Sequence, residues 1–173
     1  MSTFGNTSAG DTIGLFYGSG ELIGFLVAST QNRTIDSISV SSNRNTADGK
    51  IKGVLVLHSN HNIISNGVGS GITLGATKTW HISTFSTPPS VINTTDYDIS
   101  VISGDDASDQ VYIYYDSGQT DDPLYDGSNN YTTPTNPTDG NHTSITNKKF
   151  SIYATYTPTT TEVIGPFPTH FKV

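Results

Sequence analysis

Two segments of alternating side chains constrain the fold of this chain more than anything else in its sequence. Residues 111–118 read VYIYYDSG, and residues 150–156 read FSIYATY. Because successive side chains of a β-strand point to opposite faces, this alternation predicts strands with one buried face and one solvated face. We expect the two segments to pair with each other and to close a β-sandwich.

The remainder of the chain has the same character. No stretch repeats apolar residues at helical spacing for more than one turn, whereas short alternating and β-branched runs recur throughout. The prediction is an all-β, antiparallel two-sheet sandwich, jelly-roll-like, with about eight strands. The predicted strands are residues 12–17, 22–29, 34–41, 51–58, 78–84, 97–103, 110–116 and 148–157.

The alternation also assigns side chains to faces. We expect Tyr97, Ile99 and Val101 in the core, with Asp98 and Ser100 on the other side of their strand. Residues 54–57 read VLVL and are apolar on both faces, which predicts a central strand that is covered on each side. The single tryptophan, Trp80, alternates with Ile82, and we expect it in the core.

The expected organisation is one β-sandwich domain at residues 12–158 between an N-terminal arm (1–11) and an extended C-terminal arm (159–173). The long loop 117–147 is functional or mobile, and Leu124, Tyr125 and Tyr131 are placed to pin it to the sandwich. The C-terminal arm contains two prolines with Val163, Ile164, Phe167 and Phe171. Such an extended segment cannot readily bury these side chains on its own domain, so we expect it on a neighbouring subunit, with a frayed terminus as the alternative.

Composition argues against several partners. Only 13% of the residues are charged and the formal net charge is −7, whereas nucleic-acid binding needs clustered Lys and Arg. No apolar run approaches the ~20 residues that span a bilayer. The first residues lack the pattern of a signal peptide, which predicts synthesis in a cytosol. The chain has no cysteine, so disulfides and thiol chemistry do not arise.

The sequence offers little for catalysis. Five histidines are scattered along the chain and no Gly-x-Ser-x-Gly motif is present, so we predict that the protein is not an enzyme. His58 and His61 are expected on opposite faces at the end of a strand, as surface residues.

Acidic residues gather in one part of the chain, since nine of the 15 lie between Asp96 and Asp126. Oxygen-rich loops of this kind can bind Ca²⁺, which makes Asp105, Asp106 and Asp109 candidate calcium ligands. The favoured interpretation is that these aspartates form turns. No other cofactor is predicted.

The tyrosines give the stronger indication of a binding surface. The alternation turns Tyr112, Tyr114 and Tyr153 outward, and Tyr125 and Tyr131 lie in the long loop. An exposed aromatic row can stack on sugar rings or anchor a protein interface. Ordinary cross-strand pairing on a solvated sheet is the alternative.

Several short segments occur in an order that resembles a known group of modules. These are residues 4–7 (FGNT), 35–40 (IDSISV) and 52–56 (KGVLV), followed by the two alternating segments above. They resemble jelly-roll-like β-sandwich modules that are appended to secreted glycan-active proteins and found in structural proteins of tailed bacteriophages and environmental viruses. The chain departs from the enzyme-appended form because no catalytic domain accompanies it and an apolar arm follows Pro158, which favours the virion form.

The expected function is therefore that of a non-enzymatic structural protein of a virus particle. Most specifically, we expect a bacteriophage capsid decoration (cement) or appendage protein, made in the host cytoplasm and located in the virion. Its partners would be protein subunits of the same particle, including copies of itself. The alternative is an extracellular carbohydrate-binding module, or a fibre-tip adhesin, that binds glycans through exposed tyrosines.

Overall fold

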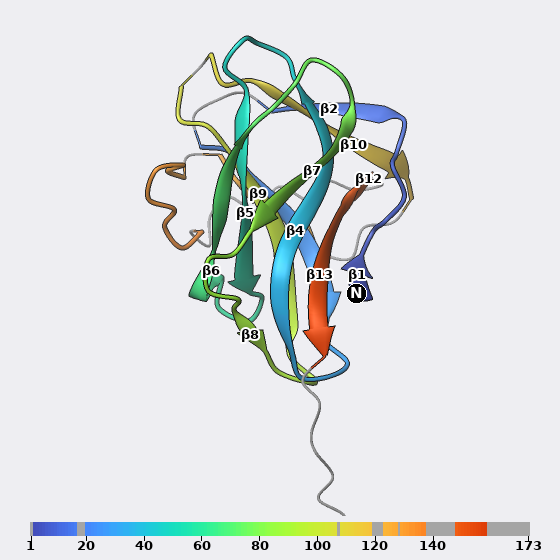
Figure 1. The fold of residues 1–173 in the computed structure, drawn as a ribbon, viewed down its shortest axis with the longest axis vertical. Coiled ribbons are helices and arrows are strands. Elements are labelled where there is room, and N and C mark those ends of the chain that lie inside the picture. The colour runs from blue at the N-terminus through green and yellow to red at the C-terminus, as the bar shows by residue number, and fades with distance from the viewer. Residues whose placement is uncertain are drawn as a thin grey trace, which may run out of the picture.

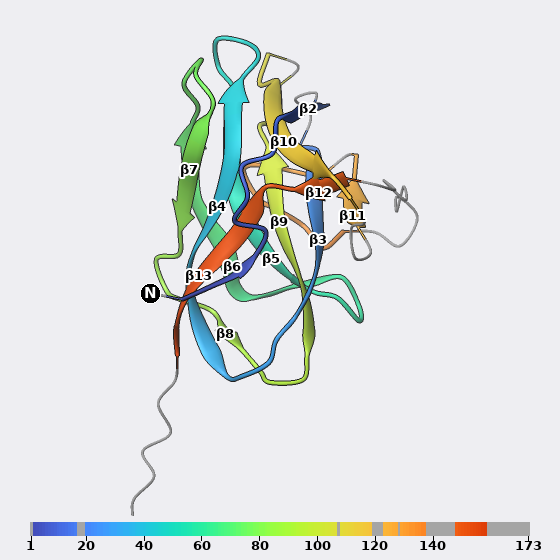
Figure 2. The same cartoon turned by 90° about the vertical axis from the view of Figure 1, so that its right-hand side faces the viewer.

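The chain folds into two antiparallel β-sheets that pack face to face (Figures 1 and 2). The computed structural model describes residues 2–16, 20–106, 108–118, 123–127, 129–137 and 148–158. Thirteen strands and no helix occur in these ranges. The predicted all-β sandwich is confirmed, with more strands than the sequence indicated.

The larger sheet contains eight strands. In the order β1-β13-β4-β10-β12 each strand pairs with the next, while β2 pairs with β10 and both β7 and β8 pair with β4. The bounds are β1 Ser2–Gly5, β2 Thr12–Phe16, β4 Arg33–Arg44, β7 Thr79–Thr84, β8 Ser90–Val91, β10 Val111–Ser117, β12 Lys148–Phe150 and β13 Ile152–Pro158.

The smaller sheet contains five strands in the order β11-β3-β9-β5-β6. Their bounds are β3 Leu22–Ala28, β5 Lys50–Leu57, β6 Asn62–Thr73, β9 Asp96–Ser103 and β11 Pro123–Asp126. In Figure 1 the strands β4, β7 and β13 of the larger sheet lie in front of β5 and β9.

The two alternating segments pair with each other only in part. β12 pairs with β10, but β13 leaves β10 and pairs with β4 and β1. The change of partner occurs at Ser151, which is fully buried. Its N–H donates to the Tyr114 carbonyl at 2.9 Å, and its carbonyl accepts from the Ser41 N–H at 2.9 Å. Ser151 therefore joins three strands, because its two backbone groups bond to different neighbours.

The N-terminal residues belong to the sandwich and do not form a separate arm as far as the structure describes them. Ser2–Gly5 pairs with β13 in the register Ser2 to Tyr156 and Phe4 to Ala154. The buried Asn6 side chain donates from Nδ2 to the Phe150 carbonyl at 3.1 Å. The C-terminal arm, with Val163, Ile164, Phe167 and Phe171, lies outside the described residues.

The main core lies between the two sheets. As predicted, Tyr97, Ile99 and Val101 of β9 are buried in it. The inward side chains of the two alternating segments also enter it: Val111, Ile113, Phe150, Ile152 and Ala154 are buried, and Tyr115 and Tyr156 pack against them. Burial of a large apolar side chain contributes about 1.5–3 kcal/mol before the cost of ordering the chain.

A second, smaller apolar cluster lies on the outer face of the five-stranded sheet. It consists of Leu22, Val54, Val56, Ile102 and Leu124, with Ile63 and Tyr131 packed against it. Because Val54 and Val56 enter this cluster while Leu55 enters the main core, β5 is covered on both faces, as its sequence predicted. Leu124 and Tyr131 hold parts of the long loop against the sheet, which confirms the packed form of that loop for residues 123–127 and 129–137.

Polar groups also join the two sheets. The Ser83 hydroxyl of β7 accepts from the Gly53 N–H at 2.9 Å and donates to the Ser70 carbonyl at 2.7 Å, and both of those partners belong to the five-stranded sheet. Two glycines leave room for it: a Cβ on Gly53 would lie 3.2 Å from the Ser83 Cβ, and one on Gly69 would lie 2.4 Å from its hydroxyl oxygen. The inner face of β7 therefore contributes hydrogen bonds where a hydrophobic side chain would be expected.

The longest of the strands that the sequence did not indicate is β6. Its pairing with β5 is irregular, since Val54 pairs with Val68 and Val56 pairs with Ile63. Asn66, which precedes Gly67, has φ of 61° and lies within this irregular part of β6. The local positive φ that favours asparagine is present, but it bends a strand and does not end it.

Candidate functional site

The outer face of the eight-stranded sheet carries a group of large aromatic and aliphatic side chains. On β4, Ile38 and Val40 face the core, so Ser39 and Ser41 face outward. Residues that lie directly opposite these serines in neighbouring strands point to the same side. Trp80 pairs with Ser41, whereas Ile82 and Tyr153 both pair with Ser39.

Two more members come from β10 and β2. Tyr112 pairs with Asn43 of β4, and Ile13 pairs with Tyr114. We call the five side chains Trp80, Ile82, Tyr153, Tyr112 and Ile13 the outer patch. Ile82 and Ile13 are 56% and 49% exposed, and they are two of the three large hydrophobic side chains described as exposed.

The sequence placed Trp80 in the core, and that prediction is wrong. Trp80 is partly exposed, and its ring meets the Tyr153 ring edge to face at a centroid distance of 4.9 Å. The strands of both rings flank β4 on opposite sides, and only small serines lie between them. The rings therefore lean across β4 and touch, an arrangement worth about 0.5–1.5 kcal/mol beyond burial.

Tyr114 does not belong to the exposed row that the alternation predicted. It does point outward, but only 9% of its surface is exposed. Its hydroxyl donates to Asn43 Oδ1 at 2.8 Å, and Lys78 Nζ lies 4.5 Å from its ring centroid. Lys78 is held there by the Gly10 carbonyl at 2.6 Å, so the segment after β1 covers this tyrosine.

The β4 serines beneath the outer patch are polar but uncharged. The hydroxyls of Ser39 and Ser41 are buried and have no hydrogen-bond partner among the described residues. Beside them, the Ser37 and Thr155 hydroxyls bond to each other at 2.6 Å. Hydroxyl groups and aromatic rings on a pleated surface can bind neutral ligands or protein, and they lack the positive charge that a phosphate ligand requires.

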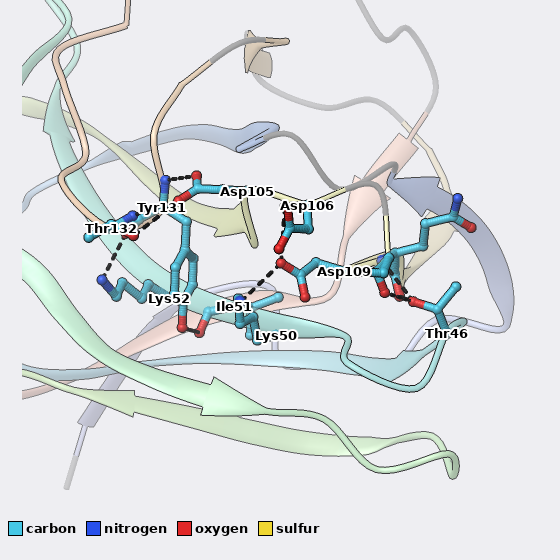
Figure 3. Close-up of polar contacts among 11 residues, drawn as sticks. Thr46, Lys50, Ile51, Lys52, Asp105, Asp106, Asp109, Tyr131 and Thr132 are labelled. Atoms are coloured by element: carbon cyan, nitrogen blue, oxygen red, sulfur yellow. Dashed lines mark hydrogen bonds and ion pairs between the residues drawn. The ribbon is translucent and has the colours of Figure 1, made fainter.

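The loop tyrosines have different surroundings. Tyr131 is half-buried against the second apolar cluster, and Lys52 Nζ donates to its carbonyl at 2.8 Å while lying 4.3 Å from its ring centroid (Figure 3). Its hydroxyl donates to the Ile51 carbonyl at 3.4 Å, and burial raises its pKa above the usual value. Tyr131 thus fastens the loop to β5. The side chain of Tyr125 lies outside the described part of the chain.

The candidate calcium ligands bond to groups of the protein itself. The Asp105 carboxylate accepts from the Tyr131 N–H, from the Thr132 N–H at 3.2 Å and from the Thr132 hydroxyl at 3.1 Å (Figure 3). The buried Asp109 forms an ion pair with Lys50 at 3.0 Å and accepts from the Asp106 N–H at 3.1 Å.

These bonds favour the structural interpretation of the acidic segment. A polar hollow of about 310 Å³ lies beside the ion pair, lined by Asp48, Lys50, Thr73, Asp106, Ser108 and Asp109. The hydrogen bond that the Lys50 ammonium donates to the Asp109 carboxylate raises the pKa of Lys50, so the ammonium group stays charged. The lysine supplies the positive charge that a bound cation would otherwise bring.

His58 and His61 lie together, contrary to the prediction that they point to opposite faces. Their rings meet edge to face at a centroid distance of 5.8 Å. The strand ends at Leu57, and His61 has φ of 54°, so strand alternation does not apply between them. The sequence HSNH of residues 58–61 does not give the direction of either ring.

Comparison with known proteins adds no identification: no protein-family model, curated protein or solved structure matches the chain. Among the described residues, no helix is long and apolar enough to cross a membrane.

Proposed function

We propose that this protein is a non-enzymatic structural component of an assembled particle and acts through contacts between subunits. The specific form of the proposal is a decoration or appendage protein of a virus particle, such as a bacteriophage capsid. The outer patch is its docking face, together with the C-terminal arm.

The exposure of the outer patch is the observation that carries this proposal. Isolated exposed hydrophobic side chains are ordinary on a protein surface, but here two exposed isoleucines accompany Trp80, Tyr112 and Tyr153 on one sheet face. Interface cores are enriched in aromatic residues and depleted of charge; three of the five members of this patch are aromatic and none is charged. Each large side chain that a partner covers fully would contribute about 1.5–3 kcal/mol before the costs of association.

Matched substitutions test the docking face. Ile82 in the patch and Ile92 outside it have similar exposures, 56% and 62%. Ile82→Lys places a charge in the proposed interface, and Ile92→Lys makes the same change elsewhere. Size-exclusion chromatography with light scattering should show that the wild type and Ile92→Lys associate while Ile82→Lys stays monomeric. Equal association of both variants, or a monomeric wild type at every concentration, would contradict the docking face.

The arm is tested separately by a chain that ends at residue 161. Loss of residues 162–173 should abolish assembly, while circular dichroism still reports the folded sandwich. Assembly that is unchanged in this shortened chain would remove the arm from the proposal and leave the sheet face to be judged by the isoleucine pair.

Glycan binding is the second candidate, and the contact between Trp80 and Tyr153 favours it. Aromatic rings that lie against a flat sheet beside hydroxyl groups suit the apolar faces of sugar rings. A glycan array separates the two candidates, because a particle component of the first kind needs no sugar affinity. Binding that is lost in Trp80→Thr but kept in Ile92→Lys would establish the second.

A further inference from the structure

We propose that His58, His61 and Asp98 form a binding site for a divalent transition-metal cation of the Zn²⁺ class. The site lies where the turn between β5 and β6 meets β9, on the side of the smaller sheet that faces away from the main core. This goes beyond the proposed function and does not depend on it.

The β-ladder brings His58 and Asp98 together. β5 and β9 are antiparallel with Val56 opposite Asp98, and the His58 N–H donates to the Asp96 carbonyl at 3.1 Å. His58 and Asp98 are therefore diagonal neighbours on one face, a separation that long side chains span. His58 Nδ1 lies 3.0 Å and 3.2 Å from the two carboxylate oxygens of Asp98.

The turn returns His61 to the same place. Asn62 N–H donates to Asn60 Oδ1 at 3.0 Å, which closes the turn, and His61 has φ of 54°. One potential ligand atom from each of His58, His61 and Asp98 lies within 4.8 Å of the other two. This is the one such group of three found among the described residues.

The ligand types select the class of metal. Two imidazoles and a carboxylate suit Zn²⁺ and its neighbours in the first transition row, whereas Ca²⁺ and Mg²⁺ prefer oxygen ligands throughout. With bonds of about 2.0–2.1 Å, adjacent ligand atoms of such a cation are about 3–3.4 Å apart. The spacing between His58 Nδ1 and Asp98 already fits. The His61 ring is partly exposed in a turn and needs to move inward by at most roughly 1.5 Å.

The burial of the Asp98 carboxylate is an electrostatic reason for a cation to bind at this site. The Asp98 side chain is fully buried, and its neighbour in the ladder, Val56, belongs to the second apolar cluster. A buried carboxylate is costly unless positive charge and hydrogen bonds compensate it. A divalent cation brings two positive charges to this carboxylate and binds imidazole nitrogens at the same time. His58 remains 23% exposed, so an ion can reach the site from solvent.

A bound cation would stabilise a larger part of the structure than the turn that contains His61. Asn62, next to His61, accepts from Asn136 Nδ2 at 2.9 Å, and the Ile63 N–H donates to Asn136 Oδ1 at 2.9 Å. These bonds dock residues 129–137 on the start of β6. The cation would thus tie β9, the β5–β6 turn and the docked loop together, and three protein ligands would leave a coordination position for water or for a group from a partner.

Calorimetric titration with ZnCl₂, after dialysis against a chelator, tests the site. The variants are His61→Asn, which keeps a residue that tolerates positive φ, and Asp98→Asn, which removes the charge. His142→Ala is the control, because it also removes one imidazole from the chain. We expect one Zn²⁺ per chain, affinity reduced more than about tenfold in both variants and unchanged affinity in the control.

A thermal melt gives a second readout. Zn²⁺ should raise the melting temperature of the wild type and of His142→Ala, and CaCl₂ should raise neither. Wild-type protein that binds no Zn²⁺, or His61→Asn that binds it as tightly as the wild type, would overturn the proposal. If Asp98→Asn does not fold, His61→Asn decides alone, since its side chain lies in a solvent-facing turn.

Discussion

Replacement of Leu124 by alanine tests whether the described part of the long loop is a structural layer of the sandwich. Leu124 is 2% exposed and packs in the second apolar cluster with Leu22, Val54, Val56 and Ile102. Truncation removes about three methylene equivalents, or about 2.4 kcal/mol of burial at ~0.8 kcal/mol each. The cavity that remains adds to this loss, but the covering segment can partly collapse, so we expect about 2.5–3.5 kcal/mol in total.

Leu55→Ala is the matched comparison. Leu55 is fully buried between the two sheets, where less relaxation is possible, and should cost about 4 kcal/mol. Urea unfolding followed by circular dichroism measures both variants. A loss below about 1 kcal/mol in Leu124→Ala would refute the reasoning, because that is the range of substitutions outside a packed core. Hydrogen exchange should also increase in residues 129–137 of Leu124→Ala before it increases in β9.

Two further predictions concern polar groups. Burial lowers the pKa of His81 below its ordinary value of 6.5, and a hydrogen bond with the Ser42 backbone opposes this shift to a smaller extent. The unfolded chain therefore binds a proton at this histidine more readily than the folded chain does. The contribution of His81 to folding stability is complete above pH 6.5 and declines as the pH falls below that value. The difference in urea midpoint between about pH 7.5 and about pH 5.5 should be larger in the wild type than in His81→Thr, and an equal difference would contradict the assignment. Asp105→Ala removes three hydrogen bonds that hold Tyr131 and Thr132. Because this carboxylate is exposed, we expect the free energy of unfolding to fall by about 1 kcal/mol. A similar fall in Asp106→Ala would show that the hydrogen bonds to the loop are not the cause.

The apolar strands were predictable because their alternation reports burial directly. In β9 and β5 the side chains that face the main core are hydrophobic, so the inner face could be read from residue type. β6 was missed because glycines and Asn66 interrupt its alternation and bend it. The four-residue β1 was missed because it is short and gains its stability from β13, which lies more than a hundred residues later in the chain.

The candidate site was harder to predict. Trp80 was placed in the core because alternation identifies two faces but not which of them is inside. On β7 the inner face carries Ser83, whose hydroxyl bonds to the opposite sheet, so the usual rule of hydrophobic residues inside is reversed there. Tyr114 was expected to be exposed because nothing in the sequence indicates that Lys78 and the Gly10 segment cover it.

The grouping of His58, His61 and Asp98 could not be predicted from the sequence either, because it depends on three-dimensional structure. It depends on the register between β5 and β9 and on the positive φ of His61. A pattern of spacing along the chain contains neither of these quantities.

Fluorescence of Trp80 tests the central claim most directly, because Trp80 is the only tryptophan in the chain and lies in the outer patch. The measurement is quenching by acrylamide across a concentration series, with light scattering on the same samples to report assembly. If the outer patch is the docking face, Trp80 will be quenched readily in the monomer, and its emission will move to shorter wavelength and resist quenching as the assembly forms. Assembly with Trp80 as accessible as in the monomer would contradict the account.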